Sequence, residues 1–164
     1  MSEKRRLIEK ARKLGLEYMR VYRGCAQTTL LAVADTLDME VSDDLFKAMI
    51  GLSSLSGGCG GICGATAAIG LRYGVPREDH ESPETGRRVY NKILNTVKMV
   101  RNKMGEKYGG YLCCDVQRSL FGRSFDLTVP EEREAFGKEP VYERCPRVTE
   151  DVAGWTVEAI LDMD

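Results

Sequence analysis

The sequence predicts an all-α protein, a bundle of about six helices in a single domain. Apolar residues recur at spacings of three and four along most of the chain, which is the pattern of amphipathic helices. No segment alternates apolar and polar residues over the length of a strand. The chain has 164 residues, of which 43% are hydrophobic, and this suffices for one hydrophobic core. We therefore expect one domain over residues 1–164.

Three helices are expected in the first third of the chain. Apolar spacing predicts a helix over residues 3–22, which Gly24 would end. A second helix would begin at Cys25. Ser42 precedes two aspartates and has the side chain of an N-cap, so it predicts a short third helix.

Two more helices follow a glycine-rich turn at residues 56–65. The first of them, over residues 65–71, consists mostly of small and aliphatic residues and would end near Gly74. Its small side chains would let neighbouring backbones come close. The sequence SPE at residues 82–84 combines a cap, a proline and an acid, and so predicts the start of a long helix over residues 83–107.

The last part of the chain has a less regular pattern. A short helix is expected over residues 115–121, closed by Gly122. Residues 123–144 are expected to be irregular, with at most one helical turn at residues 131–136. The CP pair at residues 145–146 would open the final helix.

The composition argues against several classes of function. The net charge is −1, from 24 basic and 25 acidic residues, whereas nucleic-acid-binding proteins are usually markedly basic. No apolar run approaches the ~20 residues of a membrane span. The N-terminal segment MSEKRR leads into a charged stretch without the apolar core of a secretory signal. We therefore expect a cytoplasmic protein with no nucleic-acid partner.

Cysteine and histidine usage points to metal or redox chemistry. The chain has six cysteines and one histidine, and in a reducing compartment such cysteines more often serve metals or redox reactions than structural disulfides. His80 lies in an acidic, turn-like segment and is expected to be a solvated loop residue. A site with several histidines is impossible on one chain, and a catalytic cysteine–histidine pair would need His80.

Four cysteines, Cys25, Cys63, Cys113 and Cys145, fall at or near expected helix starts. Unpaired backbone N–H groups and the helix dipole at such positions lower the pKa of a thiol and favour the thiolate, which binds metals and attacks disulfides. The alternative is that these cysteines are small buried apolar residues.

The spacing of the cysteines excludes several known motifs. No C-x-x-C pair is present, which argues against a thioredoxin motif, a zinc ribbon and a C-x-x-C-H haem attachment. Gly58 and Gly60 lack the preceding strand of a dinucleotide-binding loop, and no Walker lysine follows them. We therefore expect neither haem nor a nucleotide cofactor.

Three readings of the cysteines remain open. Four thiolates could hold an iron–sulfur cluster, of the 2Fe–2S or 4Fe–4S type, or a structural zinc ion. Alternatively, a metal-free protein could cycle between thiols and disulfides. Cys59 with Cys63, and Cys113 with Cys114, would then supply the extra redox thiols.

The sequence resembles the C_GCAxxG_C_C family of redox-active proteins from about residue 18 to residue 162. Ala68 stands where the family's CGAxxG motif has glycine. The resemblance is carried by GCAQ at residues 24–27, CGA at 63–65, GLRYG at 70–74, LCCDVQ at 112–117, LFGRSFDL at 120–127 and CP at 145–146.

The resemblance implies a redox protein whose four characteristic cysteines are Cys25, Cys63, Cys113 and Cys145, with Cys59 and Cys114 outside the pattern. A similar domain occurs in split-Soret cytochromes, which are dimers with an iron–sulfur centre beside haem. This implies an iron–sulfur cluster on the four cysteines, 2Fe–2S ahead of 4Fe–4S, in a homodimer that transfers electrons to a redox partner protein. It is more an electron-transfer protein than a classical enzyme.

Overall fold

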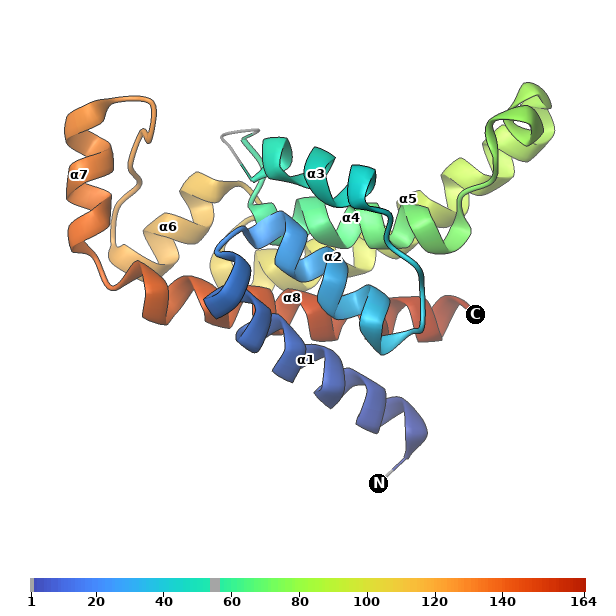
Figure 1. Cartoon of the computed structure of the whole chain (residues 1–164), viewed down its shortest axis with the longest axis horizontal. Coiled ribbons are helices and arrows are strands. Elements are labelled where there is room, and N and C mark those ends of the chain that lie inside the picture. Colours follow the sequence, from blue (N-terminus) through green and yellow to red (C-terminus); the bar gives the residue numbers. More distant parts are fainter. Residues whose placement is uncertain (1, 54–56) are drawn as a thin grey trace.

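The fold of this chain consists of helices joined by short connections (Figure 1). The computed structural model describes residues 2–53 and 57–164, so that residue 56 of the expected glycine-rich turn lies outside the described residues. Within them are eight α helices, one 3-10 helix and a single isolated β-bridge, which confirms the all-α prediction. The elements are α1 (Glu3–Tyr22), α2 (Cys25–Thr36), α3 (Asp43–Leu52), α4 (Gly60–Tyr73), η1 (Arg77–Glu81), α5 (Pro83–Tyr108), α6 (Cys113–Phe121), α7 (Pro130–Lys138) and α8 (Val141–Met163).

The core forms around α8, against which α1, α2, α4 and α5 pack. In Figure 1, α6 and α7 lie at one end of the molecule, and η1 lies at the other beside the start of α5. Apolar side chains at helical spacing meet in the middle and exclude water, which is the main stabilising contribution to such a fold. The largest fully buried side chains include Leu30, Met49, Ile69, Val100, Met104, Val152, Val157 and Ile160.

Small residues let α4 approach α2 closely, as the sequence predicts. A β-carbon on Gly64 would lie 2.3 Å from the backbone oxygen of Ala26, so no larger residue fits there without moving the two helices apart. Ala65 and Ala68 on the same helix are fully buried. This contact places the beginnings of α2 and α4 side by side.

A buried carboxylate links α8 to α1 and α5. Asp151 is 3% exposed and accepts hydrogen bonds of 2.5 Å from Arg12, Lys107 and Tyr108. Burial alone would raise the pKa of Asp151, but the hydrogen bonds and positive charges of these neighbours hold it below its ordinary value. The ionised side chain thus connects three helices.

The N-terminal boundaries of several helices follow local capping, as expected. The hydroxyl of Ser42 accepts a hydrogen bond from the backbone N–H of Leu45 at 3.2 Å and caps α3. Ser82 caps α5 in the same way, through the N–H of Thr85. His80 lies in η1 and is exposed, which confirms that it is a solvated residue.

Two expectations near the C-terminus are wrong. Residues 123–144 were expected to be irregular apart from one helical turn at 131–136, but that turn is part of a longer helix, α7. Phe136 of this helix packs on the rings of Phe121 and Phe125 with centroid distances of 5.8 and 5.4 Å. Contacts between residues far apart in sequence thus stabilise a segment with weak helical periodicity. The seven helices delineated from the sequence correspond to α1–α6 and α8, and α7 and η1 bring the helical elements of the described residues to nine.

The last helix also begins earlier than expected, at Val141 rather than at the CP pair. Pro146 lies inside it. Proline has a helical φ angle, and near a helix start it removes only one intrahelical hydrogen bond, so the helix continues through it. In the described part of the chain, no helix combines the length and apolarity needed to cross a membrane.

Candidate functional site

The cysteines lie at or near the beginnings of four helices. Cys25 begins α2 and Cys113 begins α6, as the sequence predicts. Two positions differ from the prediction. Cys63 is one turn inside α4, whose N-cap is Cys59, and Cys145 is one turn inside α8. The glycine-rich segment becomes helical already at Gly60 because its packing on α2 compensates for the weak helix propensity of glycine.

A short backbone ladder joins the glycine-rich segment to the segment before α6. The N–H of Cys59 donates to the carbonyl oxygen of Tyr111 at 2.9 Å, and the N–H of Cys113 donates to that of Gly57 at 3.1 Å. Gly58 and Leu112 form the antiparallel bridge between them. Cys59 and Cys113 are therefore held on adjacent segments by main-chain hydrogen bonds.

Glycines allow the cysteines to come together. A β-carbon on Gly60 would lie 2.6 Å from the β-carbon of Cys25, and one on Gly58 would lie 3.2 Å from the sulfur of Cys63. Side chains at either position would collide with a cysteine or push it away. The glycine-rich sequence thus serves close packing around sulfur.

The cysteines lie close enough together to affect one another's pKa. Cys145, Cys113 and Cys63 contribute to the raised pKa of Cys25, and Cys59 and Cys113 contribute to that of Cys145. The N-terminal ends of α2, α4, α6 and α8 lie toward the end of the molecule that carries α6 and α7 (Figure 1). The fold therefore brings thiols from four helices into one region.

The expectation of low thiol pKa values is wrong for the cysteines with a resolved shift. Burial, and secondarily the neighbouring thiols, raise the pKa of Cys25 and of Cys145 to about 12. The pKa of Cys59 is raised further, again mainly by burial. Loss of hydration outweighs the helix dipole at these positions. Cys25, Cys59 and Cys145 are consequently neutral thiols in the absence of a bound cation.

Cys113 and Cys114 have different surroundings. Burial and Cys114 raise the pKa of Cys113, while Gln117 opposes this by donating a hydrogen bond to its sulfur at 3.5 Å. The thiol of Cys114 donates to a carboxylate oxygen of Asp115 at 3.8 Å. The two adjacent sulfurs thus have separate partners, and Cys113 is the one that interacts with the other helices.

Two glutamines support the site, and the sequence analysis did not single them out. Gln117 also accepts a hydrogen bond from the N–H of Phe125 at 2.7 Å, which fixes its amide. Gln27 accepts from the hydroxyl of Ser53, and the same hydroxyl accepts from the N–H of Ala26 at 3.0 Å. In the sequence, the signal for both glutamines is their position after a cysteine: Gln27 follows Cys25 by two residues, and Gln117 follows Cys113 by four. Both are buried in the structure.

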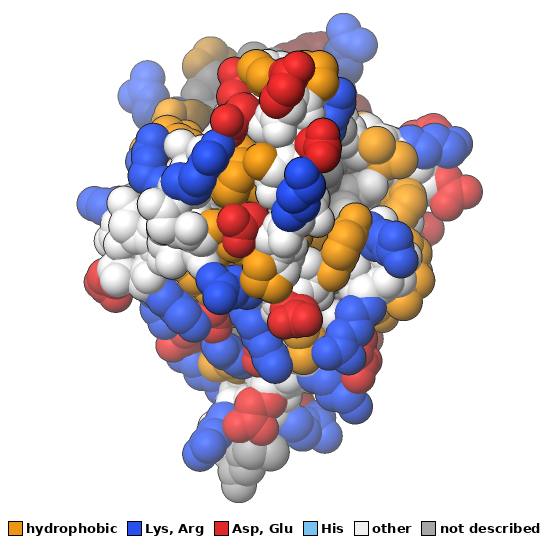
Figure 2. Space-filling model, turned by 90° about the vertical axis from the view of Figure 1, so that its left-hand side faces the viewer, with side chains coloured by type: hydrophobic (Ala, Val, Ile, Leu, Met, Phe, Trp, Pro, Cys, Tyr) orange, Lys and Arg blue, Asp and Glu red, His pale blue; other side chains and the backbone are white. Residues whose placement is uncertain are grey.

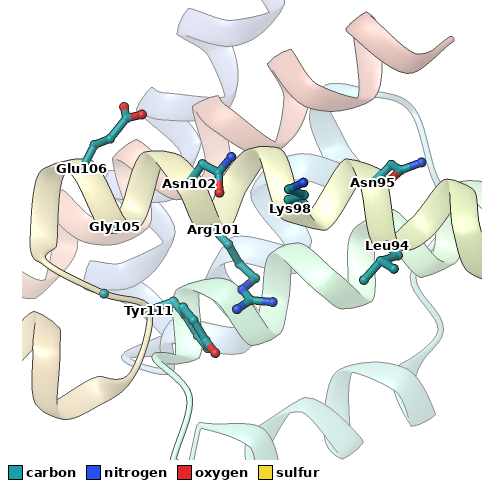
Figure 3. A pocket seen from close by; sticks show the side chains of 9 residues that line it. Leu94, Asn95, Lys98, Arg101, Asn102, Gly105, Glu106 and Tyr111 are labelled. Atoms are coloured by element: carbon teal, nitrogen blue, oxygen red, sulfur yellow. The ribbon is translucent and has the colours of Figure 1, made fainter.

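A shallow pocket lies near this region, along the outer face of α5 (Figure 3). The guanidinium of Arg101 lies over the ring of Tyr111 at 4.1 Å, and both residues line the pocket. Its described lining includes no cysteine. The pocket is connected to the cysteines through Tyr111, whose carbonyl oxygen accepts the hydrogen bond from the N–H of Cys59.

The donor set is all sulfur, which suits soft metals and iron–sulfur clusters. Across residues 2–53 and 57–164, however, no three His, Cys, Asp or Glu side chains stand in an arrangement that would hold a single metal ion. Around the end of the molecule that carries α6 and α7, basic and acidic side chains are interspersed on the surface (Figure 2). The group of thiols is therefore the feature of this chain that can bind a metal or take part in a redox reaction.

These observations define an all-α protein with a buried, thiol-rich site. The chain belongs to the family described as "Putative redox-active protein (C_GCAxxG_C_C)", whose match spans residues 24–159 and so includes all six cysteines. An uncharacterized protein of Archaeoglobus fulgidus is 33% identical over 129 residues, which cover 76% of this chain and 82% of that protein. No solved structure matches the chain. The family suggested by the sequence motifs is thereby confirmed.

Proposed function

We propose that this protein transfers electrons through an iron–sulfur cluster bound by Cys25, Cys63, Cys113 and Cys145. The observation that carries the proposal is that cysteines from four different helices lie in one region, where a backbone ladder and the close packing of Gly58 and Gly60 hold them. Membership of a redox-active family supports the same chemistry. A 2Fe–2S cluster is placed ahead of a 4Fe–4S cluster, and both use four cysteines.

The residues fit such a group in their chemistry. A cluster needs thiolates, and buried thiols with raised pKa values release their protons when a metal cation takes the place of those protons. The cation also removes the repulsion that thiolates would otherwise exert on each other. A metal that binds here must therefore displace the thiol protons, and isolated thiolates are not expected at neutral pH.

A cluster fits the spacing of the thiols better than one zinc ion does. Four thiolates bound to a single zinc lie ~2.3 Å from it, and so nearly touch each other. The described residues do not contain such an arrangement. A cluster distributes its ligands over several iron atoms, which lets the sulfurs stand further apart. Structural zinc is therefore the third choice.

When bound, such a cluster takes up and releases electrons one at a time. The chain's own residues hold the sulfurs and exclude water from them. The amide of Gln117 donates to the sulfur of Cys113, and hydrogen bonds of this kind raise the reduction potential of a cluster. Its fixed orientation, through Phe125, makes that contact a constant feature of the site.

A metal-free thiol–disulfide protein is the second candidate. Cys113 and Cys114 are adjacent and only partly buried, as a redox-sensitive pair would be. The attacking species in disulfide exchange is the thiolate, however, and a pKa of about 12 at Cys25 and Cys145 leaves very little thiolate at neutral pH. This candidate thus ranks below the cluster.

We also propose that the protein forms a homodimer and that this dimer exchanges electrons with a separate redox partner protein. Tyr90 and Leu94 are exposed one turn apart on α5, and Leu71 is exposed on α4, which packs against α5. Exposed apolar residues on adjoining helices support a protein interface. Light scattering over a range of concentrations tests the dimer, and a monomer throughout would reject it.

The decisive experiment is anaerobic purification followed by a visible spectrum and assays for iron, zinc and acid-labile sulfide. We expect brown protein with broad visible absorption and more iron than zinc. Colourless protein that contains zinc and resists reconstitution with iron and sulfide would contradict the proposal. Metal-free protein with a reversible disulfide would favour the second candidate.

A further inference from the structure

Cys59 lies outside the family's four-cysteine pattern but is the most buried of the six cysteines, at 6% exposed. It is the N-cap of α4, and its backbone N–H is fixed by the carbonyl oxygen of Tyr111. A β-carbon on Gly61 would lie 3.7 Å from its sulfur. Main-chain hydrogen bonds and close packing therefore give this side chain a defined place.

Cys59 faces the same thiols as the four pattern cysteines do. The backbone ladder puts it beside Cys113, and Gly60, the next residue, packs on the β-carbon of Cys25. Cys25 and Cys113 contribute to the raised pKa of the Cys59 thiol. Cys59 in turn contributes to the raised pKa of Cys145. Cys59 thus lies on the buried side of the thiol site.

Cys63 follows Cys59 by one helical turn. The N–H of Cys63 donates to the carbonyl oxygen of Cys59 at 3.1 Å, so the two residues share the first turn of α4. Cys59 itself is the N-cap, just before the first helical residue, Gly60. Both sulfurs interact with Cys25 and with Cys113. Either one is therefore placed to complete a set with the thiols of the other three helices.

We propose that Cys59 is a fifth thiol of the site and can take the place of Cys63 as the fourth metal ligand. The proposal rests on the proposed function and adds to it a ligand exchange within one turn of α4. In the exchange Cys59 releases its thiol proton as it binds iron, and the departing Cys63 thiolate takes up one proton. Charge and proton count are therefore unchanged, and no oxidant or reductant is needed.

The test compares iron and acid-labile sulfide in three variants after anaerobic reconstitution. Cys63→Ser should keep most of its iron, with a shifted visible spectrum, because Cys59 takes over. The double variant Cys59→Ser/Cys63→Ser should lose about tenfold or more in iron affinity, as expected when no fourth thiolate is left. Cys63→Ser/Cys114→Ser is the matched control and should behave like Cys63→Ser. Circular dichroism of the apo proteins checks that all three keep their helices.

Two results would overturn the proposal: Cys63→Ser losing iron as fully as Cys25→Ser does, or the two double variants behaving alike. A separate titration with Cd²⁺ alone, monitored by thiolate–cadmium absorption, distinguishes failure of the Cys59 proposal from failure of the iron–sulfur proposal. If the wild type takes no iron but binds Cd²⁺, Cys59→Ser/Cys63→Ser should bind Cd²⁺ about tenfold more weakly than Cys63→Ser/Cys114→Ser does. Equal Cd²⁺ binding by these two variants, or no Cd²⁺ binding by the wild type, would also overturn it.

Discussion

Asp151 and the cysteines form two buried polar regions of this protein, and they differ in what surrounds them. The carboxylate of Asp151 has cationic and hydroxyl partners from α1 and α5, which keep its pKa low. Cys25, Cys59 and Cys145 have other cysteines as neighbours, and burial keeps their pKa high. Tyr108 links the two regions. Its hydroxyl donates a hydrogen bond to Asp151, and Cys59 contributes to its raised pKa.

The difference shows how a buried ionisable group is satisfied. Asp151 is charged and its counter-charges are part of the chain, so it stabilises the fold without any ligand. The thiols of Cys25, Cys59 and Cys145 are neutral, and they become thiolates when a cation supplies the missing positive charge. We therefore expect changes at Asp151 to affect stability and changes at the cysteines to affect metal content.

The largest effect is expected at the cysteines. Cys25→Ser and Cys145→Ser replace a soft, ionisable thiol by a hard hydroxyl and should lower iron content about tenfold or more. Cys114→Ser is the control, since the Cys114 thiol has Asp115 as its partner. Iron and sulfide assays on anaerobic protein give the result. Equal iron content in all three variants would show that Cys25 and Cys145 matter no more for metal content than Cys114 does.

Asp151→Ala should lower the free energy of unfolding by about 3 kcal/mol, because it leaves Arg12, Lys107 and Tyr108 without their common partner. The control is Asp162→Ala, which removes an exposed ion pair with Lys4 and should cost about 0.5 kcal/mol or less. Urea denaturation of the apo protein measures both. Similar losses in the two variants would show that Asp151 is no more important than a surface carboxylate.

Gly60→Ala tests whether close packing of α4 on α2 builds the thiol site. Its new β-carbon would collide with Cys25, and we expect a loss of about 1–3 kcal/mol of stability together with less bound iron. Gly70→Ala on the same helix meets no atom within 4 Å and should stabilise by up to about 1 kcal/mol. Denaturation and iron assays on this pair separate packing from helix propensity. Unchanged iron in Gly60→Ala would contradict the packing argument.

The smallest effect is a pH dependence of stability. The pKa of Asp151 is lower in the folded than in the unfolded protein, so its contribution is present above the unfolded value of ~3.9 and is lost as pH falls through the folded value. The difference in unfolding free energy between wild type and Asp151→Asn should therefore shrink on acidification. Urea denaturation at neutral and acidic pH tests this. A difference that stays constant would show that Asp151 is not held in its ionised form.

Local signals in the sequence were enough for the helices whose ends are capped by nearby residues. Ser42 and Ser82 mark the starts of α3 and α5 because an N-cap bond joins residues three positions apart. The motifs around the cysteines were also enough for the family. By contrast, α7 depends on Phe121 and Phe125, which lie outside it, and so its periodicity alone did not reveal it.

The sequence by itself determined the all-α class, the family, and Cys25 and Cys113 as helix starts. Only the tertiary structure decided which thiols approach one another, and it added Cys59 to them through a ladder between distant segments. It also reversed the expected direction of the thiol pKa shifts. A helix start is a local property, whereas burial depends on every helix that packs around a side chain, and at these cysteines burial has the larger effect on the pKa.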